Sequence, residues 1–265
     1  MRLCSIASGS SGNCIYIGTD TTHLLVDTGI SKKRIEEGLT SLELSLNEID
    51  GILLTHEHSD HVSGLRVLLR KREIPVYGTK GTIRKIKESR QLGDIPEDLF
   101  QEVKQEEAFT IKDMTVTPMH ISHDAAEPVA YRFRHDKKNA AVVTDLGCYN
   151  DYTVECLRGM DALLLEANHD VRMLETGSYP YYLKQRILGE RGHLSNENSG
   201  RFLSRILHDR LKAVVLGHLS KENNMPQLAY ETVRVEITMA DNEFKGSDFP
   251  IIVARRSGVS DIIHI

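Results

Sequence analysis

Short apolar runs alternate with amphipathic stretches along most of the chain. Eight apolar runs predict strands at residues 22–27, 51–54, 74–78, 114–122, 140–145, 162–167, 212–217 and 249–255. Four stretches have apolar residues at helical spacing, at residues 31–42, 61–72, 82–92 and 198–211. In the second of these, Val62, Leu65 and Leu69 share one helical face. This alternation of strands and helices predicts an α/β protein.

The organisation of the chain predicts one domain over residues 1–265. Apolar residues make up 40% of the sequence and charged residues 27%, which is ordinary for a globular protein with a sizeable core. No stretch has the composition of a linker between domains. The strongest interruption is QLGDIPEDLF at residues 91–100. We expect either a mobile loop or the midpoint between two halves there.

Composition also narrows the class of protein. No apolar run approaches the roughly 20 residues that span a bilayer, and the first residues, MRLCSIASGSSGNC, lack the pattern of a signal peptide. The four cysteines form no CxxC pair, so we expect reduced thiols in a cytoplasmic protein. The net charge of −5 does not favour general nucleic-acid binding. Bound cations can nevertheless reverse the field in a cleft.

The densest chemistry follows the strand at residues 51–54, in the sequence THEHSDH. His56 and His58 are two positions apart on an extended segment, so their side chains point the same way. Asp60 and His61 fall at the turn into the next helix. Open α/β sheets bind ligands at this end of their strands. Three crowded imidazoles bring no packing benefit without a metal, so the pattern predicts a metal site.

Acids and histidines recur at other strand ends. Asp27 ends one strand, His123 follows another, Asp145 ends a third and His218 follows a fourth. Imidazole and carboxylate groups suit Zn²⁺ or Mn²⁺, with Fe as an alternative. If these strand ends meet, seven groups can ligate: His56, His58, Asp60, His61, His123, Asp145 and His218. Seven groups are too many for one tetrahedral ion and favour two divalent ions with a carboxylate between them.

These motifs together resemble the metallo-β-lactamase superfamily. THEHSDHVSGL is similar to its HxHxDH signature, and LLVDTG, SHDA, VVTDLG and LGHLS stand in the order of its other motifs. The resemblance covers nearly the whole chain. It implies a four-layer αβ/βα sandwich with the site at the edge where the two sheets meet.

The resemblance also implies a role for each ligand. It assigns one ion to His56, His58 and His123, and the other to Asp60, His61 and His218, with Asp145 as the bridge and Asp27 as an acid that orients a ligand. Asp145 stands where zinc β-lactamases usually carry cysteine, which argues against β-lactam hydrolysis. His58 stands where flavo-diiron proteins carry glutamate, which argues against that branch.

Four further segments resemble a narrower group. Residues 7–13 (ASGSSGN), 122–128, 166–196 and 217–224 are similar to the YycJ (WalJ) group of bacterial exonucleases. That group is related to tRNase Z and to the phosphodiesterase PhnP. The chain is too short to contain the inserted β-CASP domain of RNase J-type enzymes. The resemblance therefore implies a nuclease that acts on DNA from an end, in the 5′-to-3′ direction and in DNA repair.

The charge balance of the site favours a phosphodiester substrate. Two divalent ions with Asp60 and Asp145, and with neutral imidazoles, leave a local charge of about +2. We expect a hydroxide between the ions to attack phosphorus, with Asp60 orienting it. His193, in RGHLSN, is the expected acid that protonates the leaving oxygen, and its alternative role is to cap the following helix.

Polar residues near the predicted site are candidate substrate contacts. The loop ASGSSGN follows a first short strand and can offer N–H groups, hydroxyls and an amide to a phosphate. The expected contacts are Ser10, Ser11, Asn13, Asn168, His169, Ser220 and Asn223. A cluster of tyrosines and cations at residues 179–186 could stack bases and meet phosphates, or could simply pack.

The sequence therefore predicts a metal-dependent phosphodiesterase, with DNA favoured over RNA as its partner and no membrane. The oligomeric state stays open. The alternatives are an RNA-processing nuclease, a small-molecule cyclic phosphodiesterase, a thioester or lactone hydrolase, and a non-catalytic metal-binding protein.

Overall fold

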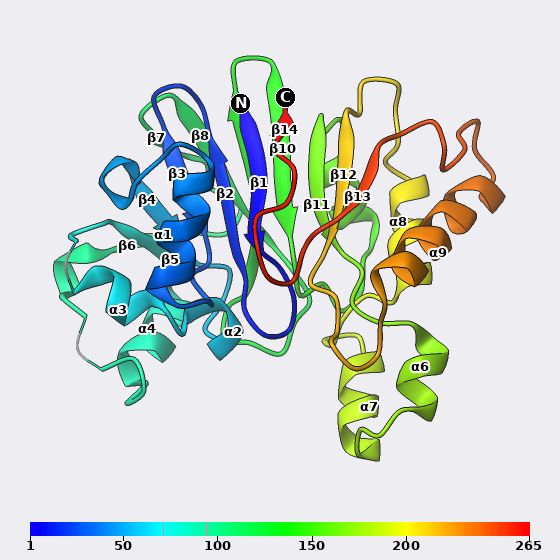
Figure 1. Ribbon diagram of the computed structural model, residues 1–265, viewed down its shortest axis with the longest axis horizontal. Helices are drawn as coiled ribbons and strands as arrows, with labels where there is room; N and C mark the ends of the chain where they lie inside the picture. The colour runs from blue at the N-terminus through cyan, green and yellow to red at the C-terminus, as the bar shows by residue number, and fades with distance from the viewer. Residues whose placement is uncertain (71, 94) are drawn as a thin grey trace.

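Two β-sheets form the centre of the molecule (Figure 1). The structure is a computed structural model that describes residues 1–70, 72–93 and 95–265. The strands of the first sheet are β1 (Arg2–Ala7), β2 (Cys14–Gly18), β3 (His23–Val26), β4 (Gly51–Leu53), β5 (Val76–Thr79), β6 (Phe100–Val103) and β14 (Ile263–His264). Those of the second are β7 (Phe109–Ile111), β8 (Met114–His120), β9 (Val129–His135), β10 (Lys138–Val143), β11 (Ala162–Glu166), β12 (Ala213–Gly217) and β13 (Ile251–Val253). Their orders are β14-β1-β2-β3-β4-β5-β6 and β13-β12-β11-β10-β9-β8-β7.

Helices cover the outer face of each sheet. Beside the first sheet lie α1 (Lys32–Ser41), α2 (Ser59–Val62), α3 (Leu65–Leu69) and α4 (Lys80–Glu88). Beside the second lie α5 (Asp151–Leu157), α8 (Asn196–Ser204) and α9 (Pro226–Met239). Two further helices, α6 (Val171–Thr176) and α7 (Tyr181–Leu188), project beyond the strand ends (Figure 1). Short 3₁₀ turns are η1 (Leu46–Glu48) and η2 (Glu97–Leu99).

The alternation of side chains along the strands produces the layers. Leu24 and Val26 of β3 belong to a buried core between the sheets, whereas Leu25 packs towards the helices of the first sheet. Val142 of β10 lies in the same central core, and Val143 packs towards the helices of the second sheet. Because successive strand residues point to opposite faces, both sheets are buried on two sides. The result is a four-layer αβ/βα sandwich.

Strand direction brings many strand ends to one edge. Strands β3 to β6 are parallel, and so are strands β10 to β13. β8 and β10 are both antiparallel to β9, so they run in the same direction. The loops that leave these strands therefore lie together at the lower edge of the molecule in Figure 1. This is the edge at which α/β sheets bind ligands.

Most of the predicted elements are confirmed. All eight predicted strands coincide with observed strands, although residues 2–7, 14–18, 100–103, 109–111, 129–135 and 263–264 add six more within the described chain. The helix predicted at 31–42 is α1. Two of the other predicted helices have shifted bounds: α4 begins at Lys80 and ends at Glu88, and α8 begins at Asn196 and ends at Ser204.

The prediction of one helix over residues 61–72 is wrong. α2 ends at Val62 and α3 begins at Leu65, because the hydrogen bonds that would join them are made elsewhere. The N–H group of Gly64 donates to the carbonyl of Thr28 at 2.8 Å. The carbonyl of Asp60, its expected partner one turn earlier, accepts from the N–H group of Asn13 at 2.8 Å. The two hydrogen bonds at this break therefore connect the segment that contains the HxHxDH motif to the loops of Thr28 and Asn13.

Two of the predictions extend onto positions outside the described residues. These positions are residue 71, in the helix predicted at 61–72, and residue 94, in the segment 91–100. Within 91–100, the described residues include η2 and the first residue of β6. The chain passes from the first sheet to the second between Val103 and Phe109, slightly beyond the expected midpoint. Among the described residues, none of the helices has the length and apolar character needed to cross a bilayer.

Candidate metal centre

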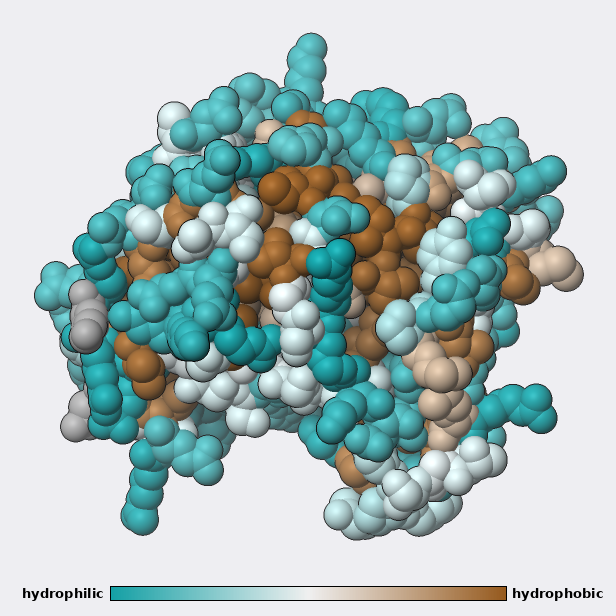
Figure 2. Space-filling view, in the orientation of Figure 1, coloured by the Kyte–Doolittle hydropathy of each residue, from teal (hydrophilic) through white to brown (hydrophobic). Residues whose placement is uncertain are grey.

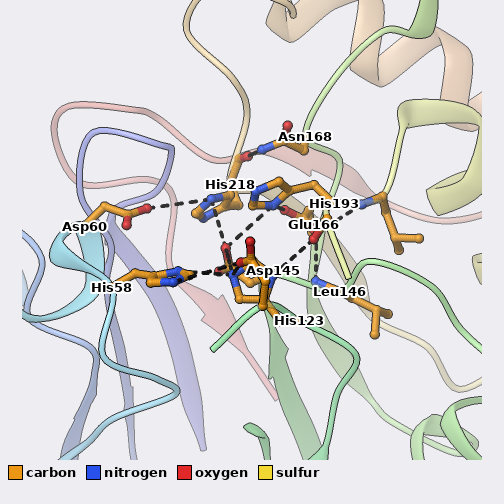
Figure 3. Close-up of polar contacts among 12 residues, drawn as sticks. His58, Asp60, His123, Asp145, Leu146, Glu166, Asn168, His193 and His218 are labelled. Carbon is orange, nitrogen blue, oxygen red and sulfur yellow. Dashed lines mark hydrogen bonds and ion pairs between the residues drawn. The ribbon is translucent and has the colours of Figure 1, made fainter. Parts of the chain in front are cut away.

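Loops from both sheets converge on one cluster of histidines and acids (Figure 3). Asp27 follows β3, His56 follows β4, His123 follows β8, Asp145 follows β10 and His218 follows β12. Figure 3 shows His58, His123, Asp145 and His218 pointing towards one another, with Asp60 reaching in from the side. The convergence that the sequence predicted is therefore present.

Three of these residues have an unusual backbone conformation. Asp27, Asp145 and His218 have φ angles of 62°, 58° and 54°. Residues other than glycine adopt this left-handed conformation rarely, at a cost of about 1–3 kcal/mol. All three stand one or two residues after a buried strand. Such strain concentrates at functional sites, where the surrounding structure holds it in place.

The first group of potential ligands consists of His56, His58 and His123. Their ligand atoms lie within 4.8 Å of one another. His58 Nδ1 is 3.0 Å from His56 Nε2 and 3.2 Å from His123 Nε2. Tetrahedral Zn²⁺ with Zn–N bonds of about 2.0–2.1 Å would separate its nitrogen ligands by about 3.3 Å. The three nitrogens thus have nearly the spacing of three corners of such a site.

The second group consists of Asp60, His61 and His218, and Asp145 lies between the two groups. Asp60 Oδ2 is 3.4 Å from His61 Nε2 and 3.8 Å from His218 Nε2. Asp145 Oδ1 is 3.3 Å from His218 Nε2 and 3.7 Å from His123 Nε2. Asp145 Oδ2 is 3.1 Å from His61 Nε2, yet this buried oxygen accepts no hydrogen bond from the described residues. A buried carboxylate oxygen without a hydrogen-bond donor fits a cation ligand.

The far nitrogens of the clustered rings have partners of their own. The pairs are His61 Nδ1 with Asp27 Oδ2 at 2.7 Å, His123 Nδ1 with the Gly192 carbonyl at 3.1 Å, His218 Nδ1 with Asn13 Oδ1 at 3.3 Å, and His56 Nδ1 with Thr55 Oγ1 at 3.0 Å. An N–H group donated on the far side leaves the other nitrogen free on the inner side. Metal-binding histidines are oriented in this way.

Burial and neighbouring charges set the protonation of the cluster. Burial, helped by His61, lowers the pKa of His56 well below its usual value, and burial also lowers the pKa of His123. Burial alone would raise the pKa of Asp145, but His218 and His61 hold it well below its usual value. The neighbouring histidines likewise outweigh burial at Asp60 and lower its pKa to about 2. Burial would lower the pKa of His61, but Asp145, Asp60 and Asp27 raise it well above its usual value. Neutral imidazoles and ionised carboxylates are the forms that bind a metal, so a bound cation must displace the proton of His61.

His193 lies beside this cluster and has a carboxylate partner that the sequence interpretation missed. Its Nδ1 donates to Glu166 Oε1 at 2.7 Å, and Glu166 Oε2 accepts from the N–H groups of Leu146 at 2.8 Å and Leu194 at 3.2 Å (Figure 3). Burial alone would lower the pKa of His193, but Glu166 raises it to about 9. Glu166 is the last residue of β11, so its position at a strand end was a signal for it.

The expected substrate contacts fall into two sets. Ser10 and Ser11 are exposed, as a contact residue should be, whereas Asn13, Asn168, His169, Ser220 and Asn223 are buried. The Asn13 amide lies between two rings of the cluster, with Oδ1 3.3 Å from His218 Nδ1 and Nδ2 3.2 Å from His61 Nε2, and Asn168 Nδ2 donates to the His218 carbonyl at 2.9 Å. The amides of these two residues contact the cluster, and a role in supporting it was the alternative interpretation of Asn168 from the sequence. Side-chain contacts so distant in sequence leave no local signal.

A close backbone approach fixes the position of Asp60. The Asn13 carbonyl accepts from the N–H group of Gly29 at 2.8 Å, and a Cβ atom at residue 29 would overlap the Asp60 carbonyl. We expect Gly29→Ala to lower the free energy of unfolding by about 3 kcal/mol, because the loops must move apart. Chemical denaturation with metal removed measures this.

Gly78→Ala is the matched control for that substitution. Its added Cβ would meet only ordinary contacts, the nearest at 3.4 Å. We expect it to change the free energy of unfolding by less than about 1 kcal/mol. Equal stabilities of the two variants would contradict the close approach.

Comparison with known proteins gives the site a context. The family model of the beta-lactamase superfamily domain matches residues 22–218 of the chain. The chain is 41% identical over 228 residues to exodeoxyribonuclease YycJ of Bacillus anthracis, covering 86% of each chain. It is 41% identical over 236 residues to exodeoxyribonuclease WalJ of Streptococcus pneumoniae, covering 89% of this chain and 88% of that one.

Solved structures match nearly the whole chain. The metallo-β-lactamase fold protein YhfI of Bacillus subtilis has a TM-score of 0.71 at 14% identity, covering 98% of both chains. A diphosphatase of the PhnP family has a TM-score of 0.66 at 21% sequence identity, and the match covers 100% of this chain and 97% of that one. The short form of human tRNase Z has a TM-score of 0.64 at 17% sequence identity, and the match covers 100% of both chains. These likenesses confirm the fold class that the sequence predicted.

Proposed function

The chain belongs to the β-lactamase superfamily, and from this premise we propose that it is a metal-dependent exonuclease acting on DNA. The observation that carries the proposal is the pair of adjacent ligand groups with Asp145 between them. The two relatives at 41% identity, both named exodeoxyribonucleases, support DNA as the substrate. The 5′-to-3′ direction and a role in DNA repair are the finer parts of the proposal, and they rest on the resemblance of the sequence motifs to this group.

The donor set fits two divalent ions. His56, His58 and His123 would hold one, Asp60, His61 and His218 would hold the other, and Asp145 would contact both. Zn²⁺ or Mn²⁺ suits imidazole and carboxylate donors, with Fe as the alternative. When bound, the ions would activate water and stabilise the charge that develops on the phosphodiester.

The remaining chemistry belongs to residues of the chain. Asp60 is partly exposed at the side of the cluster, so one of its oxygens can orient the attacking water. As the water oxygen adds to phosphorus, the bond to the leaving oxygen breaks and that oxygen needs a proton. His193 can donate it from Nε2, because Glu166 holds Nδ1 and keeps the ring protonated. Asp27 fixes His61 from behind.

An end-labelled substrate panel tests the proposal. With Mn²⁺ or Zn²⁺ we expect progressive shortening of single- or double-stranded DNA, and we expect no shortening in a chelated control, because the proposed reaction depends on bound ions. Labels at the 5′ or 3′ end report the direction. Activity on a chromogenic phosphodiester alone would contradict the nuclease proposal. Faster degradation of RNA than of DNA would contradict the proposal that DNA is the substrate.

A further inference from the structure

Helices α6 and α7 form a projection beside the metal centre. The segment leaves β11 at the edge where the ligands gather and extends beyond the sheets (Figure 1). Figure 2 shows the projection as a mostly pale and teal lobe at the lower right, with the outline of the molecule indented beside it. The projection therefore stands at the same edge of the sheets as the candidate metal ligands.

Two neighbouring tyrosines at the start of α7 are exposed. The exposed fraction is 76% for Tyr181 and 74% for Tyr182. Both exceed the 37% of Tyr152, the other tyrosine among the exposed large apolar residues of the described chain. Large aromatic rings gain stability from burial, so a consecutive pair left in water contributes little to folding. The exposed surface of Tyr181 and Tyr182 is therefore available to a binding partner.

The projection is anchored to the rim of the metal centre. The guanidinium of Arg186, on α7, donates from Nη2 to Asp124 Oδ1 at 3.0 Å. The same carboxylate oxygen is 3.5 Å from His123 Nε2 and 3.9 Å from His58 Nε2. Tyr182 and Arg186 are four residues apart and share a helical face, about 6 Å apart along the axis. Tyr182 therefore stands about one helical turn from the residue that anchors α7 to the rim of the metal centre.

The charge of the projection favours a polyanion. Residues 171–191 contain four cations (Arg172, Lys184, Arg186, Arg191) and two acids (Glu175, Glu190), a net charge of +2 in a chain of −5. Two of the cations bind carbonyls rather than carboxylates. Lys184 Nζ donates to the Glu175 carbonyl at 2.7 Å, and Arg191 Nη2 donates to the His123 carbonyl at 3.0 Å. Their charge is thus not cancelled by a carboxylate partner in these contacts and remains available to phosphates.

We propose that Tyr181 and Tyr182 form a stacking platform for the bases of single-stranded DNA that enters the metal centre. The inference rests on the proposed function and extends it to a strand-binding surface outside the ligand cluster. Base stacking on tyrosine tolerates any sequence, because every base presents a π-face. The cations of the projection then meet the phosphates between the stacked bases.

Binding without metal tests the platform separately from cleavage. The probe is a 12-nucleotide single-stranded DNA with a fluorescent label, titrated with protein in EDTA and followed by anisotropy. We expect the Tyr181→Ala/Tyr182→Ala variant to bind at least about tenfold more weakly. Tyr181→Phe/Tyr182→Phe should bind like the wild type, because its rings still stack. Met239→Ala, which removes a side chain that is 80% exposed on α9, is the control and should also be unchanged.

Further measurements separate this platform from a structural role and from the proposed function. The alanine variant should keep the metal content and the turnover of a chromogenic phosphodiester, which is too small to reach α7. Unchanged DNA affinity, or an equal loss on the small ester, overturns the platform. If the wild type binds DNA through the tyrosines but cleaves none with metal, the proposed function fails and the platform stands. A loss confined to an RNA probe overturns DNA as its ligand.

Discussion

Replacing Asp145 with asparagine is expected to abolish metal-dependent cleavage, with kcat lower by at least about a thousandfold. Asp145 is the one carboxylate of residues 1–70, 72–93 and 95–265 that lies within 4 Å of histidines from both ligand groups. Asparagine has nearly the same shape and tolerates the left-handed backbone at this position, where φ is 58°. It lacks the negative charge, so two cations would face each other without compensation between them.

Metal analysis and kinetics together measure this effect. We expect Asp145→Asn to retain at most one ion per chain after dialysis, while near-native circular dichroism shows that it is folded. Asp136→Asn is the matched control, since Asp136 has a φ of 54° in an exposed turn between β9 and β10. It should keep both ions and full activity. An Asp145→Asn enzyme with two ions and more than about a tenth of the wild-type kcat would contradict the bridging role.

The positions of the candidate ligands were predictable because each one follows a pattern that local physics controls. An apolar run forms a buried strand, and its parallel neighbours carry their own end residues to the same edge. Asp145 and His218 follow the buried strands β10 and β12, so neither position depends on a long-range side-chain contact. The order of the motifs along the chain, through its resemblance to the superfamily, then predicted the four-layer fold.

The missed features depend on contacts between residues that are distant in sequence. The break between α2 and α3 requires hydrogen bonds to Thr28 and Asn13, which no helical periodicity reports. Glu166 acquires a role only through His193, 27 residues later. The loop of Asn13 predicted a phosphate contact, and the contact of its amide with His218, 205 residues away, was not predicted. Tertiary contacts of this kind override a local pattern, and only the folded structure reveals them.

Replacing His193 with alanine is expected to lower kcat by about 10² to 10⁴-fold while both ions stay bound. The ring contributes a proton in the proposed reaction. It belongs to neither of the two proposed ligand groups, and it lies close enough to Asp145, Glu166 and His218 that the metal content must be measured beside kcat. KM for DNA should change little, because the proton is transferred only as the leaving bond breaks. His120→Ala, which removes an exposed imidazole from the end of β8, is the control and should keep full activity. Loss of an ion in His193→Ala would show that this histidine is a ligand instead.

The pH dependence of kcat tests the protonation state of the same ring. The pKa of His193 is raised to about 9, so the ring is protonated below that pH and loses its proton as the pH rises through it. The protonated form is the acid, so the wild-type kcat should fall as the pH rises through the pKa of His193 in the metal-loaded enzyme. Glu166→Gln removes the negative charge that raises this pKa, and the fall in kcat should then begin at a lower pH. The amide can still accept the N–H groups of Leu146 and Leu194, so the loop should keep its position. A pH profile that is unchanged by Glu166→Gln, with both ions present, would exclude His193 as the proton donor.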